Sequence, residues 1–340
     1  MWRHATIFLL SASIGLLSGC THRVLAKKLV QAPNQSGMAQ SGLTAKSFKE
    51  GFTPWTSTWR LPVGPPVAEL QVAVIEPADY KLKHELKIQP SATVGKSDLK
   101  IDMKWDLPAA GKTRNPAKGT VVLLHGVYVS KEAMLHWALY LAQAGYRSVL
   151  VDLRGHGQST GDWITFGAFE TRDLGLLLDD LQRRGLAGRR VGVLGISYGA
   201  SLGLLLAAKD NRVATVVALQ PFSDVRRAIP PFVRANFGSM AKGISDEDFS
   251  AATRRAAKLA GFAWAETDVV RAVSMSTAPI LLFHGTQDTW IAPEHSRELI
   301  KLAPAGSKLG LRSNDSHVTL SIRLDPIADE VVAWFNQHLP

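Results

Sequence analysis

Apolar and polar positions along the chain predict alternating strands and helices. Residues 99–105 alternate between apolar and charged side chains, which is typical of a half-buried strand. After residue 119, short charge-poor segments alternate with stretches that carry apolar residues at helical spacing. The predicted strands are 70–75, 81–88, 99–105, 120–124, 147–151, 191–194, 214–219, 279–283 and 308–311, and the predicted helices are 131–143, 174–181, 201–209, 293–302 and a last one capped by Asp325. We therefore predict an α/β fold with a mostly parallel central sheet and helices on both faces.

One segment interrupts this alternation. Residues 222–276 mix charges of both signs, favour helix and carry Pro230-Pro231 near their start. We predict that they form a helical cap inserted between two core strands, within one domain that covers residues 48–340. Residues 191–208 lack charged side chains, but their glycines favour a buried strand, a sharp turn and a buried helix over a membrane helix.

The first residues have the pattern of an export signal. Arg3 and His4 precede an uncharged run over residues 5–20, which is shorter than the roughly 20 residues of a membrane-spanning helix. The run ends in Leu17-Ser18-Gly19-Cys20. Residues 21–46 are rich in Gln, Ser, Gly and Ala, which favours a flexible segment. We predict a signal peptide over residues 1–19 and a flexible tether over residues 20–47.

The tetrapeptide at residues 17–20 resembles the cleavage box of bacterial lipoproteins. The resemblance implies a diacylglycerol thioether on Cys20, cleavage before it and acylation of the new amino terminus. An ordinary secretory signal or an uncleaved anchor is the alternative. Thr21 takes the place where Asp favours the inner membrane in enteric-type bacteria. We expect a lipid-anchored protein of the bacterial cell envelope, on the periplasmic side of the outer membrane if the source is Gram-negative.

Composition narrows the possible partners. The 340 residues are 46% hydrophobic, which excludes wholesale disorder. The formal net charge is +10, but no nucleic-acid-binding motif accompanies it, so nucleic acid is not predicted as a partner. A single cysteine excludes an internal disulfide and a Cys-rich zinc site. Without a His-x-His pair, a His-Glu-x-x-His pair or a phosphate-binding loop, we predict no metal and no cofactor.

The predicted chemistry centres on Gly195-Ile196-Ser197-Tyr198-Gly199, a G-x-S-x-G pentapeptide. In this motif the serine lies on a strained turn between a strand and a helix, and small flanking residues let the two elements approach each other. The hydroxyl is then presented at a helix N-terminus, which favours developing negative charge. The predicted strand before residue 195 and helix after it provide this context.

Across residues 99–339 the chain resembles the α/β-hydrolase superfamily, closest to the capped branch of monoacylglycerol lipases and serine aminopeptidases. The motifs that carry the resemblance are His125-Gly126, the 152–159 loop, the pentapeptide around Ser197, the 284–288 segment ending in Asp288, and His317. The resemblance implies that Ser197 is the nucleophile, His317 the general base and acid, and Asp288 the residue that orients the imidazole. It also implies an oxyanion hole made by the backbone N–H groups of Val127 and Tyr198, to which the Tyr128 hydroxyl could add a donor.

Each assignment has a competitor. Asp315 lies two residues before His317 and is the alternative acid, although we favour Asp288 because it follows a strand. His295 and His338 lie in predicted helices and are alternatives to His317. The remaining candidate histidines lie in turns and are expected to be structural: His125, His156 and His284.

These features predict a lipid-anchored serine hydrolase that cleaves carboxylic esters through an acyl-enzyme. Its partners would be a small-molecule ester or acyl substrate and a membrane reached through Cys20. One alternative is a serine peptidase or aminopeptidase of the same fold, and another is a non-catalytic envelope-binding lipoprotein. The aromatic residues of the cap could line the substrate site or form the core of the cap: Phe232, Phe237, Phe249, Phe262 and Trp264.

Overall fold

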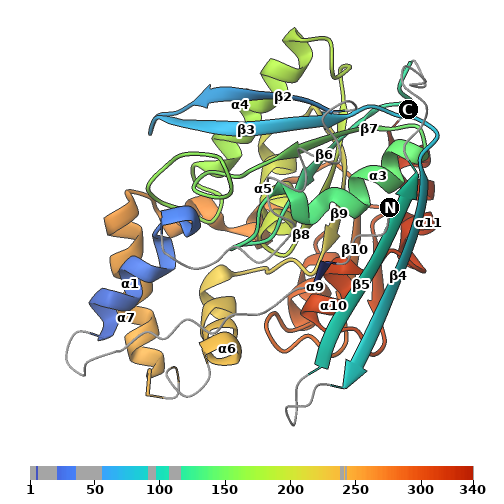
Figure 1. The fold of residues 1–340 in the computed structure, drawn as a ribbon. Coiled ribbons are helices and arrows are strands. Elements are labelled where there is room, and N and C mark those ends of the chain that lie inside the picture. The colour runs from blue at the N-terminus through green and yellow to red at the C-terminus, as the bar shows by residue number, and fades with distance from the viewer. Residues whose placement is uncertain are drawn as a thin grey trace.

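The computed structural model describes residues 5–6, 21–35, 56–90, 97–106, 116–237, 241 and 243–339. Its centre is an eight-stranded sheet in the order β11-β10-β9-β8-β6-β7-β3-β2 (Figure 1). The strands of this sheet are β2 (Thr56–Val63), β3 (Ala68–Ile75), β6 (Thr120–Leu124), β7 (Arg147–Val151), β8 (Val191–Ile196), β9 (Val213–Leu219), β10 (Ile280–Gly285) and β11 (Lys308–Arg312). The six strands from β6 to β11 are parallel, whereas β3 is antiparallel to both β2 and β7.

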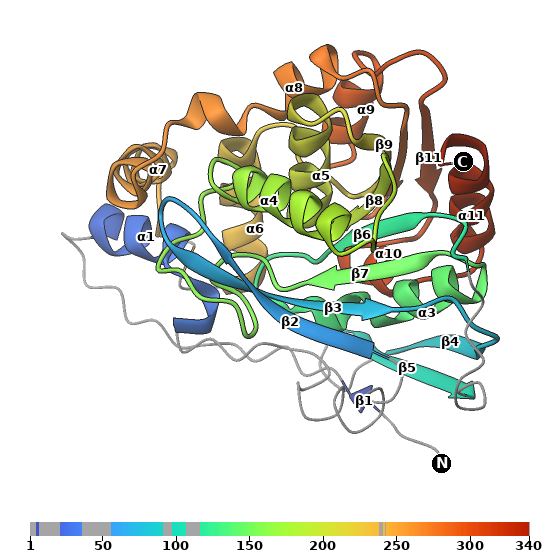
Figure 2. The ribbon, with the colours of Figure 1, turned by 90° about the horizontal axis from the view of Figure 1, so that it is seen from above.

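Helices cover both faces of the sheet (Figure 2). Along β6, Val122 and Leu124 pack on one face with α4 (Glu170–Arg183) and α5 (Tyr198–Lys209), whereas Val121 and Leu123 pack on the other with α3 (Leu135–Gln143) and α11 (Ile327–His338). This alternation follows from the two-residue period of a strand. The other helices of these layers are α8 (Val269–Met275), α9 (Glu294–Ile300) and α10 (His317–Ile322). The predicted fold class is confirmed.

Between β9 and β10 the chain forms α6 (Val225–Phe237), α7 (Asp246–Ala260), a 3-10 helix (Trp264–Thr267) and α8. This is the segment that the sequence predicts as a helical cap. Because α8 packs against α5 and α9, it belongs to the layer that covers the sheet. Within this segment, α6 and α7 stand away from the sheet (Figure 1).

The prediction of a flexible tether over residues 20–47 is wrong for residues 21–35. Thr21–Val30 form helix α1, followed by a 3-10 helix at Pro33–Gln35. Helix α1 packs against α7, and the two helices lie side by side in both views (Figures 1 and 2). Leu25, Ala26, Leu29 and Val30 are buried at i, i+1, i+4 and i+5, which makes one apolar face over two turns. This short stripe was hidden by the polar composition of the longer segment.

Smaller differences concern the ends of elements. Strand β2 was not predicted, and the residue that caps α11 is Pro326 rather than Asp325. The predicted helix at residues 131–143 begins as a 3-10 helix (Lys131–Met134) and continues as α3. A smaller sheet holds β4 (Lys81–Pro90), β5 (Ser97–Asp106) and β1 (Ala5–Thr6).

Apart from Ala5–Thr6, the predicted signal peptide and Cys20 lie outside the described residues. No helix in the described part of the chain is long and apolar enough to span a bilayer.

Candidate active site

Ser197 lies on the sharp turn between β8 and α5. Its backbone angles are φ 54° and ψ −112°, a strained conformation that non-glycine residues rarely adopt. A Cβ atom at position 195 would lie 2.3 Å from the Gly199 carbonyl oxygen, and one at position 199 would lie 2.2 Å from the Leu124 carbonyl oxygen. Only glycine therefore allows the strand and the helix to approach this closely. The turn leaves Ser197 partly exposed between buried neighbours.

His317 lies next to this serine although 120 residues separate them in sequence. The distance between His317 Nε2 and Ser197 Oγ is 2.9 Å. The imidazole belongs to the first residue of α10, a helix capped by the Ser316 side chain. Buried Gln220, which follows β9, donates from Nε2 to the His317 carbonyl oxygen at 2.9 Å. The backbone that carries the imidazole is therefore held by a side chain from the neighbouring strand end.

Asp288 completes the hydrogen-bonded chain. Its Oδ2 atom accepts a hydrogen bond from His317 Nδ1 at 2.6 Å, while Oδ1 accepts from the backbone N–H groups of Trp290 and Ile291 at 2.9 Å each. Burial alone would raise the pKa of this carboxyl, but hydrogen bonds from His284 and His317 hold the pKa well below its usual range. The ionised carboxylate keeps the proton of His317 on Nδ1, so the Nε2 lone pair faces the serine hydroxyl.

The competing acid is engaged elsewhere. Asp315 Oδ1 accepts hydrogen bonds from the Thr319 hydroxyl at 3.0 Å and from Arg323 Nε at 2.8 Å. These contacts brace the start of α10 rather than the imidazole. The structure brings Asp288, and not Asp315, to His317.

The other candidate histidines have structural partners. His295 Nδ1 accepts from the Ser223 N–H at 3.1 Å, and His338 packs on Trp334. His125 donates from Nδ1 to the Gly126 carbonyl oxygen at 2.7 Å, while its Nε2 accepts from the Leu153 N–H at 3.0 Å. Burial lowers the pKa of His125 to about 4, so this imidazole is neutral at pH 7.

His156 donates from Nδ1 to the Arg154 carbonyl oxygen at 2.9 Å, and burial lowers its pKa to about 3. His284 has a larger role than the sequence suggested. Its Nε2 lies 2.8 Å from the Ile291 carbonyl oxygen and 3.4 Å from Asp288 Oδ2, so it also steadies the acid.

The predicted oxyanion-hole residues, Val127 and Tyr198, lie next to Ser197. Tyr198 is the first residue of α5, so its N–H has no acceptor within the helix. The turn after β6 lies against the serine, since a Cβ at Gly126 would be 3.8 Å from Ser197 Cβ. Val127 and Tyr128 line the cavity that contains Ser197. Burial raises the pKa of Tyr128 to about 12, so its hydroxyl stays protonated and able to donate.

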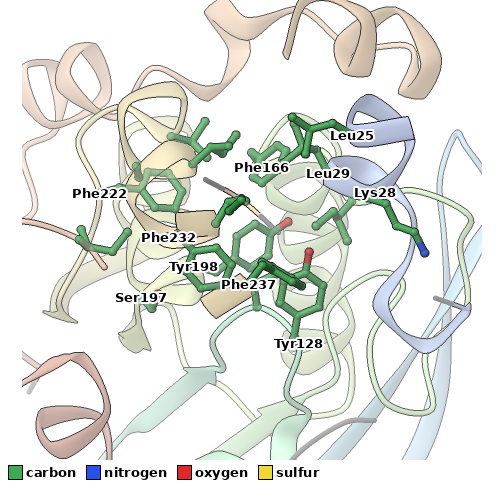
Figure 3. A pocket seen from close by; sticks show the side chains of 18 of the residues that line it. Leu25, Lys28, Leu29, Tyr128, Phe166, Ser197, Tyr198, Phe222, Phe232 and Phe237 are labelled. Atoms are coloured by element: carbon green, nitrogen blue, oxygen red, sulfur yellow. The ribbon is translucent and has the colours of Figure 1, made fainter. Parts of the chain in front are cut away.

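Ser197 opens onto an apolar cavity (Figure 3). The lining comes from the turn after β6, from cap helix α6 and from α1. Phe232 and Phe237 line this cavity, whereas Phe249, Phe262 and Trp264 do not. Phe262 and Trp264 instead pack edge to face, with ring centroids 4.9 Å apart. The aromatic residues of the cap are thus divided between the cavity wall and the cap core.

Three further residues surround the hydrogen-bonded chain, and of these the sequence predicted only His284, as a structural histidine. Gln220 holds the His317 backbone, His284 contacts Asp288, and the Trp290 ring lies 5.0 Å from the His317 ring. The one available signal was position, because Gln220 and His284 are polar residues at the carboxyl ends of charge-poor strands. Among the described residues, no group of three or more His, Cys, Asp or Glu side chains could hold a metal ion.

Comparison with known proteins agrees with this architecture. A Bacillus subtilis (strain 168) protein named "Putative esterase YitV" is 32% identical over 108 residues, which are 28% of this chain and 42% of that protein. The Pyrococcus furiosus esterase Pf2001 superposes with a TM-score of 0.61 at 16% identity, covering 88% of this chain and 99% of that one. A Mycobacterium tuberculosis puromycin-hydrolyzing peptidase superposes with a TM-score of 0.55 at 15% identity, covering 84% and 39%.

The structural similarities show the fold alone, because their sequence identities are low. A comparison of the sequence with family models goes beyond the fold and identifies a family. Residues 121–321, which contain the nucleophile turn, Asp288 and His317, match the model of the Alpha/beta hydrolase family. The order of the strands and the site at their carboxyl ends agree with that match, and the chain belongs to the α/β-hydrolase family.

Proposed function

We propose that this hydrolase is a serine esterase that cleaves carboxylic esters through an acyl-enzyme on Ser197. The observation that carries the proposal is the hydrogen-bonded chain from Asp288 through His317 to a partly exposed serine at the floor of an apolar cavity. An ionised acid, a base with a fixed tautomer and a nucleophile within 2.9 Å of that base are the parts that acyl transfer requires.

Acylation begins when the Ser197 hydroxyl proton moves to His317 Nε2 and Oγ bonds to the ester carbonyl carbon. The carbonyl oxygen takes the negative charge and is bound by the Val127 and Tyr198 N–H groups. When the tetrahedral intermediate collapses, the bond to the alcohol breaks and His317 returns the proton to the leaving oxygen. Water then gives a proton to His317 and attacks the acyl carbon, and Ser197 leaves with that proton.

Ester substrates suit the cavity better than peptides do. Lys28 is the only charged residue among the described residues that line it, and Figure 3 shows its ammonium group directed away from the cavity. Two arginines of cap helix α6 pair elsewhere, Arg226 with Asp224 at 2.8 Å and Arg234 with Asp246 at 2.6 Å. A charged peptide terminus would find no partner of this kind beside Ser197. The sequence similarity to the protein named "Putative esterase YitV" supports the same choice.

Activity-based labelling tests the nucleophile. A fluorophosphonate probe should label the wild-type chain, and Ser197→Ala should abolish labelling and lower kcat on p-nitrophenyl butyrate by about 10⁴-fold or more. The control is Ser274→Ala, an exposed serine on α8 that should leave both readouts unchanged. Aminoacyl p-nitroanilides, measured beside the esters, decide between esterase and peptidase. Labelling that persists in Ser197→Ala would exclude this nucleophile, and a folded wild type inert to the probe would favour a binding protein.

We also propose that the chain is lipid-anchored through Cys20, on the periplasmic side of the outer membrane of a Gram-negative cell. The support is the tetrapeptide that ends at Cys20 and the single cysteine of the chain. Cys20 directly precedes α1, and α1 lines the cavity. A lipid at this position would therefore hold the substrate site close to the membrane surface.

A further inference from the structure

Helix α1 contributes one wall of the cavity in which Ser197 lies. Val24, Leu25, Lys28 and Leu29 line it, and Figure 3 places Leu25 and Leu29 on the opposite side from Ser197. This helix lies outside residues 121–321, the part of the chain that matches the family. The far wall of the cavity therefore comes from a segment that the family match does not include.

The last residue of α1 and the segment that follows it are hydrogen-bonded to the rest of the domain. The Ile164 N–H donates to the Val30 carbonyl oxygen at 2.8 Å, and the Ala32 N–H donates to the Asp162 carbonyl oxygen at 2.9 Å. Asn34 Nδ2 donates to the Ser159 carbonyl oxygen at 2.7 Å. These bonds tie the segment to the loop between β7 and α4, while Ala26 and Val30 are fully buried. The helix therefore has a fixed position, which it needs if it is to limit the length of the cavity beside Ser197.

The lining between Ser197 and α1 suits a hydrocarbon chain. Tyr128, Phe166 and Phe232 lie along it, and the two buried α1 residues that line the cavity are leucines. In an esterase the acyl group stays on Ser197 while the alcohol leaves and water enters. An apolar cavity with a far wall is therefore suited to the acyl chain, the part of the substrate that remains.

We propose that Leu25 and Leu29 are specificity-determining residues that close the far end of an acyl-chain site. The substrate class is then esters of fatty acids, and α1 sets the longest acyl chain that fits. This inference rests on the esterase function proposed above. Each methylene that enters the apolar cavity should raise kcat/KM about fourfold until the chain reaches α1, after which kcat/KM should fall.

The test is a series of p-nitrophenyl esters from acetate to palmitate, assayed on the full chain. Leu25→Ala combined with Leu29→Ala should move the optimum to longer acyl chains and raise the ratio of long-chain to short-chain kcat/KM by about tenfold or more. Leu29→Trp should remove activity on the long esters while p-nitrophenyl acetate is still cleaved. The matched control is Val30→Ala, which is equally buried in α1 but does not line the cavity. It should lower stability and leave the chain-length profile unchanged.

The outcomes separate this inference from the proposed function. If all variants keep the wild-type profile while the probe labels them and acetate is cleaved, the role of α1 is wrong and the esterase function stands. If Val30→Ala shifts the profile as much as the leucine variants, the effect comes from loosening of the helix and the assignment fails. If the wild type is labelled but cleaves no ester in the series, both the acyl site and the esterase function are overturned.

Discussion

Among the residues of the site, Asp288 has the environment that best explains the geometry. One carboxylate oxygen accepts hydrogen bonds from two backbone N–H groups, and the other accepts one from the His317 imidazole. His284 Nε2 lies 3.4 Å from Asp288 Oδ2. Three hydrogen bonds and the neighbouring His284 hold an ionised group in place inside the protein, which offsets the cost of burying it. The buried charge therefore orients His317, and in the proposed mechanism it stabilises the imidazolium that forms when His317 takes the Ser197 proton.

At this scale, Asp288→Asn should lower kcat on p-nitrophenyl butyrate by about 10⁴-fold. The amide would present N–H or C=O to Nδ1 without the charge, and the tautomer with its Nε2 lone pair toward Ser197 would no longer be favoured. Steady-state kinetics with the folded variant measures the effect.

Asp315→Asn is the matched control, because it changes the other buried acid near His317 in the same way. It should weaken the contacts to Thr319 and Arg323 and lower the urea midpoint, while kcat stays within a few-fold of wild type. A reversal of these two results would assign the catalytic acid to Asp315.

Among the elements, the turn after β6 depends on one buried histidine. His125 lies between the carboxyl ends of β6 and β7, donating to Gly126 and accepting from the Leu153 N–H. If Nε2 became protonated, two donors would face each other and a charge would be buried. Burial accordingly lowers the pKa of His125 to about 4, from an ordinary value of 6.5.

The sign of the pH effect follows from this depressed pKa. Between about pH 6.5 and pH 4 the unfolded chain binds a proton at this position and the folded chain does not, so the free energy of unfolding falls as the pH falls through this window. His125 contributes up to about 3 kcal/mol to that loss. Urea unfolding at several pH values should show it, and His125→Asn should reduce the slope. An equal slope in the variant would show that other groups carry the effect.

At the scale of the whole molecule, the site draws on segments that are far apart along the chain. The proposed nucleophile Ser197 follows β8, the proposed acid Asp288 follows β10, and the proposed base His317 lies after β11, because parallel strands bring their carboxyl ends to one edge of the sheet. Helix α1, near the start of the chain, and α6 of the cap line the cavity above this edge. The proposed lipid on Cys20 would attach α1, and with it this wall of the cavity, to a membrane.

The anchor can be tested in cells. Globomycin should cause the precursor to accumulate, and Cys20→Ser should move the protein from the membrane fraction to the soluble periplasmic fraction. Catalytic activity per molecule of the released variant should stay near wild type, because Cys20 does not belong to the catalytic chain. Membrane retention of Cys20→Ser and an unchanged precursor level would together refute lipidation.

Local pattern was sufficient for much of the fold. Strands at residues 120–124 and 147–151 were predicted with the bounds that the structure has, because continuous apolar runs between turn residues mark buried strands. The pentapeptide around Ser197 also carries its own geometry in its glycines. Helix α1 was missed because two turns of apolar spacing carry little signal inside a polar segment, and their meaning depends on α7, more than 200 residues further along the chain.

The pattern along the chain was enough to predict the alternating elements and the order of Ser197, Asp288 and His317, and the family resemblance added the prediction of serine chemistry. Contacts in the folded chain were needed to show that Asp288 rather than Asp315 meets the imidazole, that Gln220 and His284 lie around this pair, and that α1 forms a wall of the cavity. Hydrophobic periodicity records which face of a segment is buried, whereas hydrogen bonds and cavities arise where segments that are distant in sequence pack together.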